Sequence, residues 1–301
     1  MTRQRAIGPK RRVAMGDRPI LWILPLLVFL CAFFLFPLAD VIRLSFTNAT
    51  LKTMEADFTF SSYARVFQDS AFGNVLWVTG FFVAFSVVFQ FLLGFGIAYT
   101  VDSAEKRHLR GTVVVRTVSL ISWAIPGVAI GIIWKILYAE NTSGIFNYLL
   151  SLLGLNQVAF LSDPKNALLN ISIANVWRGT AQSMILLYAG LKTVSLDILE
   201  AADVDGVSGW QKVLKIIVPS MRSVIMVNIL LNVINTFNTF DMIMPLTGGG
   251  PGRSTEVLVL SSYRTIFQQL DLGKGCAIAV ILLMINVVFS LIYMRANGEE
   301  R

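Results

Sequence analysis

Charge, histidine and cysteine are all scarce in this chain of 301 residues. Only 14% of its residues are charged, against roughly a quarter in a typical soluble domain, while 55% are hydrophobic and the mean hydropathy is +0.68. So few charges cannot solvate the whole surface, and most of it must face hydrocarbon. The composition therefore excludes an ordinary soluble domain and predicts an integral membrane protein.

The shortage of reactive side chains excludes most catalytic chemistry. Cys31 and Cys276, the two cysteines, both fall in apolar segments, where we interpret them as small hydrophobic helix residues rather than a disulfide scaffold or a Cys-x-x-Cys metal pair. His108 is the single histidine and has no second histidine or thiol nearby. No Ser/His/Asp set and no paired carboxylates fall together at membrane depth. We expect no catalytic centre, no metal site and no cofactor on this chain.

The net charge of +7 raises the possibility of a nucleic-acid partner, but the charges are distributed for another role. Basic residues cluster beside the apolar runs, where Lys and Arg set the orientation of a membrane protein. The glycine-rich stretch 248–254 lacks the lysine of a phosphate-binding loop and is expected outside the membrane. We therefore predict no nucleic acid among the partners and interpret this stretch as an external turn.

Six apolar runs are long enough to cross a bilayer, whose hydrocarbon core of about 30 Å needs about 20 helical residues. They are Pro19–Ala39, Ser70–Val101, Thr117–Trp134, Asn166–Leu191 (interrupted by Arg178), Ser223–Phe240 and Gly275–Met294. A cleaved signal peptide is the alternative for the first run, but the run is too long and no cleavage site follows it. The expected fold class is an all-α integral membrane protein with six transmembrane helices, in which 1–18 and 295–301 are tails and 19–294 is the transmembrane domain.

The orientation follows from the 25 Lys and Arg residues. With the N-terminus inside, 16 of them fall on the cytoplasmic side, 8 on the opposite side, and Arg178 within a run. Cytoplasmic segments carry the excess of positive charge. Both termini are therefore predicted in the cytoplasm, together with the segment 195–219 between the fourth and fifth runs, which we call the elbow.

The elbow is too charged to cross a membrane, and it contains start and stop signals for two short helices. Asp197 is expected to cap the first helix with Glu200 reaching back to it, and Gly206 to supply the left-handed stop. Ser208 and Gln211 predict a capping box for the second. The second helix has an apolar face of Trp210, Val213, Leu214 and Ile217 and is expected to end at Pro219.

An ordinary amphipathic connector is the alternative interpretation of the elbow. It does not explain the small Ala201–Ala202 pair beside an acidic residue. That pair has a shape suited to insertion into a groove of another protein.

Two stripes of polar residues run along the fourth and fifth apolar runs. The first comprises Asn175, Arg178, Gly179 and Gln182, and the second comprises Asn228, Asn232, Asn235, Thr236 and Thr239. Each stripe shares one helix face, and neither can face lipid because amides and Arg are costly there. They either join helices by hydrogen bonds or line a cavity for a hydroxyl-rich solute, with Trp177, Phe237 and Phe240 as aromatic candidates.

The predicted external loops are short. The loop 138–165 contains an amphipathic helix ended by Gly154, the stretch 247–253 is a Gly/Pro turn, and 256–270 can form a short interfacial helix. None is long enough for a further domain.

The elbow sequence EAADVDGVSGWQKVLKIIVPS resembles the EAA motif of permease subunits of binding-protein-dependent ABC importers, with Val218 in place of Leu as the one departure. The stretch Leu246–Pro251 (LTGGGP) resembles a loop of sugar permeases, and Asn175–Gly179 (NVWRG) resembles their fourth-span signature. The resemblance covers about Ala71–Met294. It is strongest to the maltose-type permeases and, among these, to those of actinobacterial trehalose importers.

This resemblance implies import of a small carbohydrate, trehalose or a related disaccharide, across a bacterial cytoplasmic membrane. The implied partners are membrane lipid, a second permease subunit, two ATPase subunits that bind ATP and Mg²⁺, and an extracytoplasmic sugar-binding protein. The elbow would be the coupling helix that docks on an ATPase subunit. The coupling residues implied are Glu200, Ala201, Ala202, Asp205, Gly206 and Pro219.

The resemblance also implies roles for residues outside the elbow. The positions that match sugar contacts are Asn175, Arg178, Gly179, Gln182, Asn232, Asn235, Thr236 and Thr239. Arg178 and Asn235 replace apolar residues of the family, which indicates that the contacts, the sugar or both have changed. Gly249, Gly250 and Pro251 match the loop where the binding protein docks.

Three other functions remain as alternatives. An ion-driven carrier needs carboxylates at membrane depth and inverted repeats, but the six runs hold no Asp or Glu between their charged ends. A membrane-bound enzyme needs catalytic side chains, which the sequence does not offer. The third alternative is an ABC permease for a solute other than a sugar. The solute that the cognate binding protein binds would distinguish it from a sugar permease.

Overall fold

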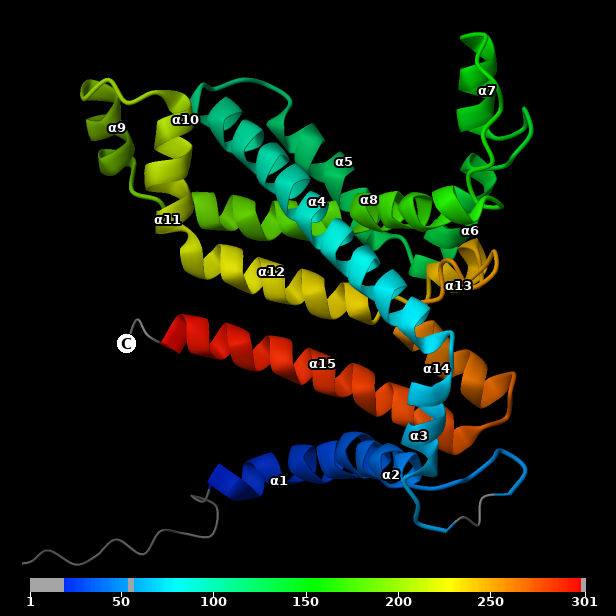
Figure 1. The fold of residues 1–301 in the computed structure, drawn as a ribbon. Coiled ribbons are helices and arrows are strands. Elements are labelled where there is room, and N and C mark those ends of the chain that lie inside the picture. The colour runs from blue at the N-terminus through cyan, green and yellow to red at the C-terminus, as the bar shows by residue number, and fades with distance from the viewer. Residues whose placement is uncertain (1–18, 54–56, 299–301) are drawn as a thin grey trace, which may run out of the picture.

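The structure, a computed structural model, describes residues 19–53 and 57–298 (Figure 1). Within these ranges it is helical, and the one β feature is an isolated antiparallel bridge between Thr47 and Phe58. The predicted N-terminal tail 1–18 lies outside the described residues, as does the end of the C-terminal tail.

The helices follow one another along the chain with short connections. The first half contains α1 (Pro19–Leu30), a π-helical turn (Cys31–Leu35), α2 (Phe36–Ser45), α3 (Ser61–Gln68), α4 (Phe72–Lys106), α5 (Thr112–Ala124), α6 (Gly127–Leu137) and α7 (Ile145–Leu152). The second half contains α8 (Pro164–Leu191), α9 (Leu196–Val204), α10 (Gly209–Lys212), a π-helical turn (Val213–Ile217), α11 (Val218–Ser220), α12 (Arg222–Phe237), α13 (Ile243–Leu246), α14 (Leu258–Phe267) and α15 (Leu272–Gly298).

Among the described residues, three helices are long and apolar enough to cross a membrane: 22–45, 72–106 and 272–296. Two bent pairs, α5 with α6 and 209–220 with α12, raise the number to five if each is one span. Helix α8 is long enough at 28 residues but is not among them, because its polar residues lower its mean hydropathy.

The third apolar run, predicted as one helix over Thr117–Trp134, is broken in the structure. Helices α5 and α6 meet at an angle of 101°. The break is at Pro126, which has no backbone N–H to continue the helix, and Ile125 before it is extended at φ −78° and ψ 129°. The prediction of a continuous helix was therefore wrong because it counted apolar residues without weighing the proline.

The short external elements have the predicted types. Helix α7 lies in the 138–165 loop, and Gly154 beyond it has φ +71°. The 247–253 stretch is a turn with three glycines at positive φ. Helix α14 forms within 256–270, but Leu258, Leu260 and Ser261 are buried, so it packs inside the protein against α15 rather than at an interface.

Helices α4 and α8 form the centre of the bundle, and Figure 1 shows them crossing. Gly94 of α4 is the point of closest approach. A Cβ at Gly94 would lie 2.4 Å from Ser183 Cβ and 2.9 Å from the backbone nitrogen of Met184. The absence of a side chain therefore sets the spacing of the two helices.

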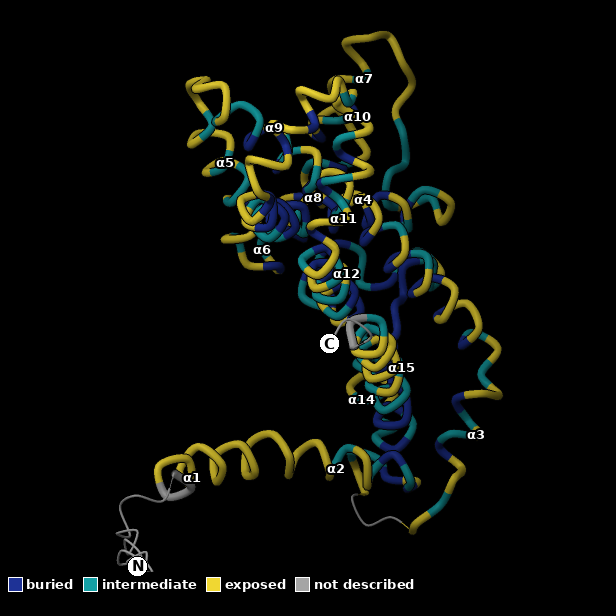
Figure 2. Tube along the Cα trace, turned by 90° about the vertical axis from the view of Figure 1, so that its left-hand side faces the viewer, coloured by how far each residue is buried: buried dark blue, intermediate teal, exposed yellow. Residues whose placement is uncertain are grey.

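The first span stands apart from this bundle. Every described residue from Trp22 to Ala39 is exposed, and Figure 2 shows α1 as a yellow arm that meets the body through α2. Helix α2 packs on the beginning of α15. The buried residues are concentrated instead along α4, α8 and α12.

We predict that Gly94→Ala lowers the stability of the purified protein by about 1–3 kcal/mol, because the added methyl overfills the α4–α8 crossing. Gly96→Ala is the matched control, since a Cβ there meets nothing within 4 Å. Thermal unfolding in detergent measures both variants. Equal midpoints for the two would contradict the close approach.

Candidate functional site: a polar cavity and an elbow

A cavity of about 400 Å³ lies between α4, α5, α8 and the end of α12. It is lined by Gln90, Trp123, Asn175, Arg178, Gly179, Gln182, Asn232, Asn235, Thr236, Asn238, Thr239 and Asp241. All eight residues predicted for the substrate path are in this set. Gln90, Trp123, Asn238 and Asp241 were missed. Gln90 and Trp123 lie on other helices, Asp241 lies beyond the second stripe, and Asn238 is off the helical spacing of that stripe, at the C-cap of α12.

The two stripes contact each other through their amides. Asn232 Nδ2 donates to Ser183 Oγ at 2.7 Å, and Asn235 Nδ2 donates to Gln182 Oε1 at 2.9 Å. Each contact joins α12 to α8 across the cavity wall. Both roles considered from the sequence are therefore present. Some of the polar residues join the helices by hydrogen bonds, and the same helix faces line a cavity.

Several lining groups keep hydrogen-bonding capacity for a solute. Gln90, which lines the cavity, donates from Nε2 to the backbone oxygen of Asn175 at 3.0 Å, and its side-chain oxygen is not used by that bond. Asn175 is buried, and its Nδ2 has no partner among the described residues. A buried donor without a partner costs about 1–3 kcal/mol, so a ligand hydroxyl or a water at this position would relieve that cost.

At Gly179 the backbone of α8 is in close contact with the side chain of Gln90. A Cβ there would lie 2.3 Å from the Gln90 amide. The glycine therefore lets Gln90 of α4 reach the cavity.

An ion pair also lines the cavity. Arg178 Nη1 and Nη2 donate to Asp241 Oδ1 and Oδ2, both at 2.9 Å. Asp241 lies between α12 and α13, one residue past the predicted end of the fifth run. The search for carboxylates inside the six runs therefore did not include it. The pair explains how an Arg is tolerated within α8, since its charge is matched by a bidentate partner.

The aromatic residues expected near the sugar lie elsewhere. Trp177 packs edge-on against Trp134, Phe237 packs against Phe289, and Phe240 packs against Tyr263. Trp123, at the end of α5, is instead the aromatic residue that lines the cavity. The sequence favoured residues near the stripes, whereas Trp123 comes from a different helix.

The elbow forms two helices with a glycine turn, and its start differs from the prediction. Helix α9 begins at Leu196, so Ser195 is the N-cap and makes no side-chain capping bond. Asp197 lies inside the first turn, where its charge favours the helix N-terminus, and the predicted capping by Asp197 with Glu200 was wrong. Gly206 has φ +72° as predicted.

The second elbow helix agrees with the sequence at both ends. The Ser208–Gln211 capping box is present, and residues 209–220 meet α12 at 77°, one residue after Ser220. Its predicted apolar face is only half buried: Val213 and Ile217 are buried, whereas Trp210 and Leu214 are exposed. Much of the apolar surface of Trp210 and Leu214 is therefore accessible.

The predicted coupling residues also include both exposed and buried positions. Glu200, Ala201, Asp205, Gly206 and Pro219 are exposed, and Ala202 is buried. Ala202 lies on the side of α9 that faces the rest of the elbow, so its small size serves packing within the chain. The other five are accessible to a second protein.

The elbow shares a hydrophobic core with the bundle. Leu199 of α9 and Val213 of the second helix are in one buried cluster with Leu187 of α8, Ala98 of α4 and Ile225 of α12. Lys212 Nζ also donates to the backbone oxygen of Leu199 at 3.4 Å and pairs with Asp203. The elbow is thus packed onto three long helices and not loosely tethered to them.

Ion pairs reinforce the end of the bundle beside the elbow. Lys192, directly after α8, contacts Asp102 at 2.7 Å and Glu105 at 2.9 Å, both on α4. Burial alone would lower the pKa of Lys192, but the hydrogen bonds to the two carboxylates outweigh it and raise the pKa. Lys192 therefore stays charged and holds α8 to α4 beside the elbow.

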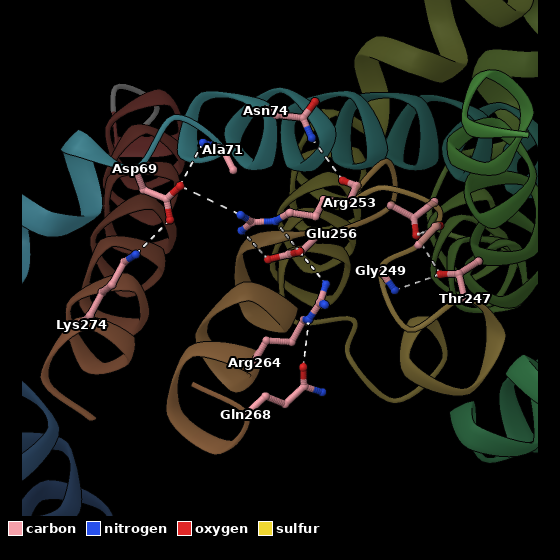
Figure 3. Close-up of polar contacts among 12 residues, drawn as sticks. Asp69, Ala71, Asn74, Thr247, Gly249, Arg253, Glu256, Arg264, Gln268 and Lys274 are labelled. Atoms are coloured by element: carbon pink, nitrogen blue, oxygen red, sulfur yellow. Dashed lines mark hydrogen bonds and ion pairs between the residues drawn. The ribbon is translucent and has the colours of Figure 1, made fainter. Parts of the chain in front are cut away.

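The glycine-rich external turn is held by a buried carboxylate (Figure 3). Glu256 is 1% exposed and accepts from Arg253 Nε and from Arg264 Nη1, both at 2.8 Å. Thr247 Oγ1 accepts from the Gly249 nitrogen at 3.3 Å and thereby closes the turn. The turn is a fixed structure in which Gly249 is buried and Gly250 and Pro251 are half-buried.

The same turn is tied to the start of two long helices. Asn74 of α4 donates to the backbone oxygen of Arg253 at 3.1 Å. Asp69, just before α4, pairs with Lys274 of α15 at 2.9 Å, and the hydrogen bond from Lys274 lowers the pKa of Asp69. In Figure 3 these residues form a continuous set of polar contacts with Arg253 and Glu256.

Within the described ranges, no group of three or more His, Cys, Asp or Glu side chains could hold a metal ion. Cys31 is exposed on the first span and Cys276 is buried in α15. These two thiols are far apart in sequence, as expected for isolated helix residues.

Curated relatives match nearly the full length of the chain. The trehalose/maltose transport system permease protein MalF of Thermococcus litoralis is 32% identical over 282 residues, covering 93% of this chain and 94% of the relative. The sulfoquinovosyl glycerol transport system permease protein SmoG of Agrobacterium fabrum is 28% identical and covers 95% and 92%. The sn-glycerol-3-phosphate permease UgpA of the same organism is 28% identical and covers 92% and 93%.

A solved structure shares the fold. A chain of a bacterial alginate ABC transporter, in complex with a pentasaccharide-bound periplasmic protein, superposes with a TM-score of 0.78 at 20% identity, over 91% of this chain and 92% of that chain. This likeness supports the all-helical membrane architecture.

The family model described as the binding-protein-dependent transport system inner membrane component matches residues 90–297, which include the cavity, the elbow and the external turn. The chain is therefore a multi-pass membrane protein that belongs to this family of ABC importer permeases.

Proposed function

We propose that this chain is one permease subunit of an ATP-driven importer for a small carbohydrate, with trehalose or a related disaccharide as the favoured solute. The observation that carries the proposal is the cavity, where two amide stripes and Trp123 surround about 400 Å³. A sugar needs many hydrogen-bonding groups and an aromatic surface, and this wall supplies both. The trehalose/maltose permease among the relatives supports the choice of solute.

The proposed topology has six spans with both termini in the cytoplasm of a bacterium. The spans are α1 with α2, α4, α5 with α6, α8, α12 and α15. Helix α8 qualifies because its polar face is turned to the cavity and its Arg is paired within the protein. The excess of Lys and Arg on one side supports the orientation.

The elbow would couple this chain to an ATPase subunit. ATP and Mg²⁺ would be bound by two such subunits, and Glu200 with its exposed neighbours would contact one of them. Because the elbow shares its core with α4, α8 and α12, motion of the elbow would tilt those helices as a body and change access to the cavity.

The remaining proposed partners are a second permease and an extracytoplasmic binding protein. The turn with Gly249, Gly250 and Pro251 would face the binding protein, because it lies at the end of the bundle away from the elbow (Figure 1). The turn is connected to α4 and α15 through Asn74 and Lys274. These contacts would transmit a movement of the turn on docking to the two long helices.

A permease for a solute other than a sugar is the second candidate, since relatives in the family carry other names. An ion-driven carrier is less well supported. Asp241 is a carboxylate near membrane depth, but both of its oxygens are held by Arg178, so it is poorly suited to relay protons.

The test of the function is the ATPase activity of the purified complex with its binding protein. Trehalose or a closely related disaccharide is expected to stimulate hydrolysis, because the loaded binding protein drives the coupled cycle. Glucose and an amino acid serve as comparison solutes. Stimulation by a non-carbohydrate, with no response to any disaccharide, would contradict the proposal.

The elbow is tested in the same assay. Glu200→Lys combined with Gly206→Pro is expected to abolish sugar-stimulated hydrolysis and uptake, because it reverses the exposed charge and forbids the φ of +72° at the turn. Asp57→Lys, which reverses the charge of an exposed carboxylate outside the elbow, controls for the change of charge alone. Intact ATP-dependent import by the elbow variant would refute the coupling role.

A further inference from the structure

The cavity contains one positive and one negative side chain. Of its twelve lining residues, Arg178 and Asp241 are the two that carry a charge. They come from different elements, α8 and the link between α12 and α13, and meet in a bidentate pair with both N–O distances at 2.9 Å. The lining therefore has no net charge.

The pair leaves the guanidinium poorly placed to bind an anion. Arg recognises phosphate and similar anions through its paired N–H donors, and here Nη1 and Nη2 are both directed to Asp241. The Asp241 side chain is 40% exposed, more than the 29% of Arg178. An anionic solute would therefore approach a carboxylate before it reached a free donor.

Asp241 is fixed in this position from a third side. Its Oδ1 accepts from the Met242 nitrogen at 3.0 Å. A Cβ on Gly127 would lie 1.7 Å from Asp241 Oδ2, so the carboxylate packs directly on the first residue of α6. The negative charge is thus held in the wall by α6, α8 and its own backbone.

We propose that the Arg178–Asp241 pair makes the cavity select neutral polyhydroxylated solutes over anionic sugars, because Asp241 cancels the charge of Arg178 that would otherwise attract an anion. The inference rests on the proposed carbohydrate function and adds the charge of the solute to it. Family membership leaves that charge open, because one relative is named for sn-glycerol 3-phosphate.

The experiment compares trehalose with trehalose 6-phosphate, which differ by one phosphate group. Equilibrium dialysis of the purified permease–ATPase complex, without binding protein, measures both radiolabelled sugars. The wild-type complex is expected to bind trehalose at least about tenfold more tightly. Asp241→Asn, which keeps the shape and the acceptor for Met242, leaves Arg178 uncompensated, and the preference should fall by about tenfold or more because a nearby unpaired charge attracts the phosphate.

The matched control is the double variant Arg178→Gln with Asp241→Asn, which is again neutral and should keep the wild-type preference. If Asp241→Asn does not assemble, as judged by size-exclusion chromatography, Arg178→Gln is measured alone. It leaves the carboxylate unpaired and should reject trehalose 6-phosphate more strongly than the wild type does.

The outcomes separate this inference from the function on which it rests. An unchanged ratio in the single variants, or the same loss of preference in the neutral double variant, contradicts the role of the pair while trehalose binding persists. A wild-type complex that binds neither sugar contradicts the carbohydrate function itself.

Discussion

The cost of placing an amide or a guanidinium in hydrocarbon is the constraint on which this structure depends. It forces the polar stripes of α8 and α12 toward one another and away from lipid. Asn232 with Ser183 and Asn235 with Gln182 then join the two helices, while the Arg178–Asp241 pair neutralises the charge of Arg178 in the middle of α8. The same requirement that stabilises the bundle leaves a wall rich in donors and acceptors around the cavity.

A second consequence is mechanical. The helices that form the cavity wall, α4, α8 and α12, continue to the end of the bundle where the elbow packs into their shared core. Lys192 holds α8 to α4 at that end, and Glu256 with Asn74 fixes the glycine-rich turn at the other. Packed contacts therefore run from one end of the bundle past the cavity to the other end.

The sequence predicted the parts of the molecule that depend on local or periodic signals. Spacing along α8 and α12 identified eight of the cavity residues, and Gly206 and Ser208 located the elbow turn. The sequence analysis missed the cavity residues whose position depends on contacts between distant segments. Trp123 lines the cavity from α5, Gln90 lines it from α4 because Gly179 leaves room, and Asp241 lines it from beyond the end of α12. Trp210 and Leu214 are apolar in sequence, yet they stay 72% and 50% exposed among the described residues.

The most direct measurement of the central claim is the solvent accessibility of the cavity wall within the membrane. With Cys31 and Cys276 replaced by Ser, a cysteine at Asn235 would be treated with a membrane-impermeant methanethiosulfonate reagent, and a cysteine at Ile229, on another face of α12 outside the cavity, would serve as control. The account predicts labelling at 235 that trehalose slows, and little labelling at 229. Equal protection of both positions in every nucleotide state would mean that the stripes only join helices and that the cavity is not a path.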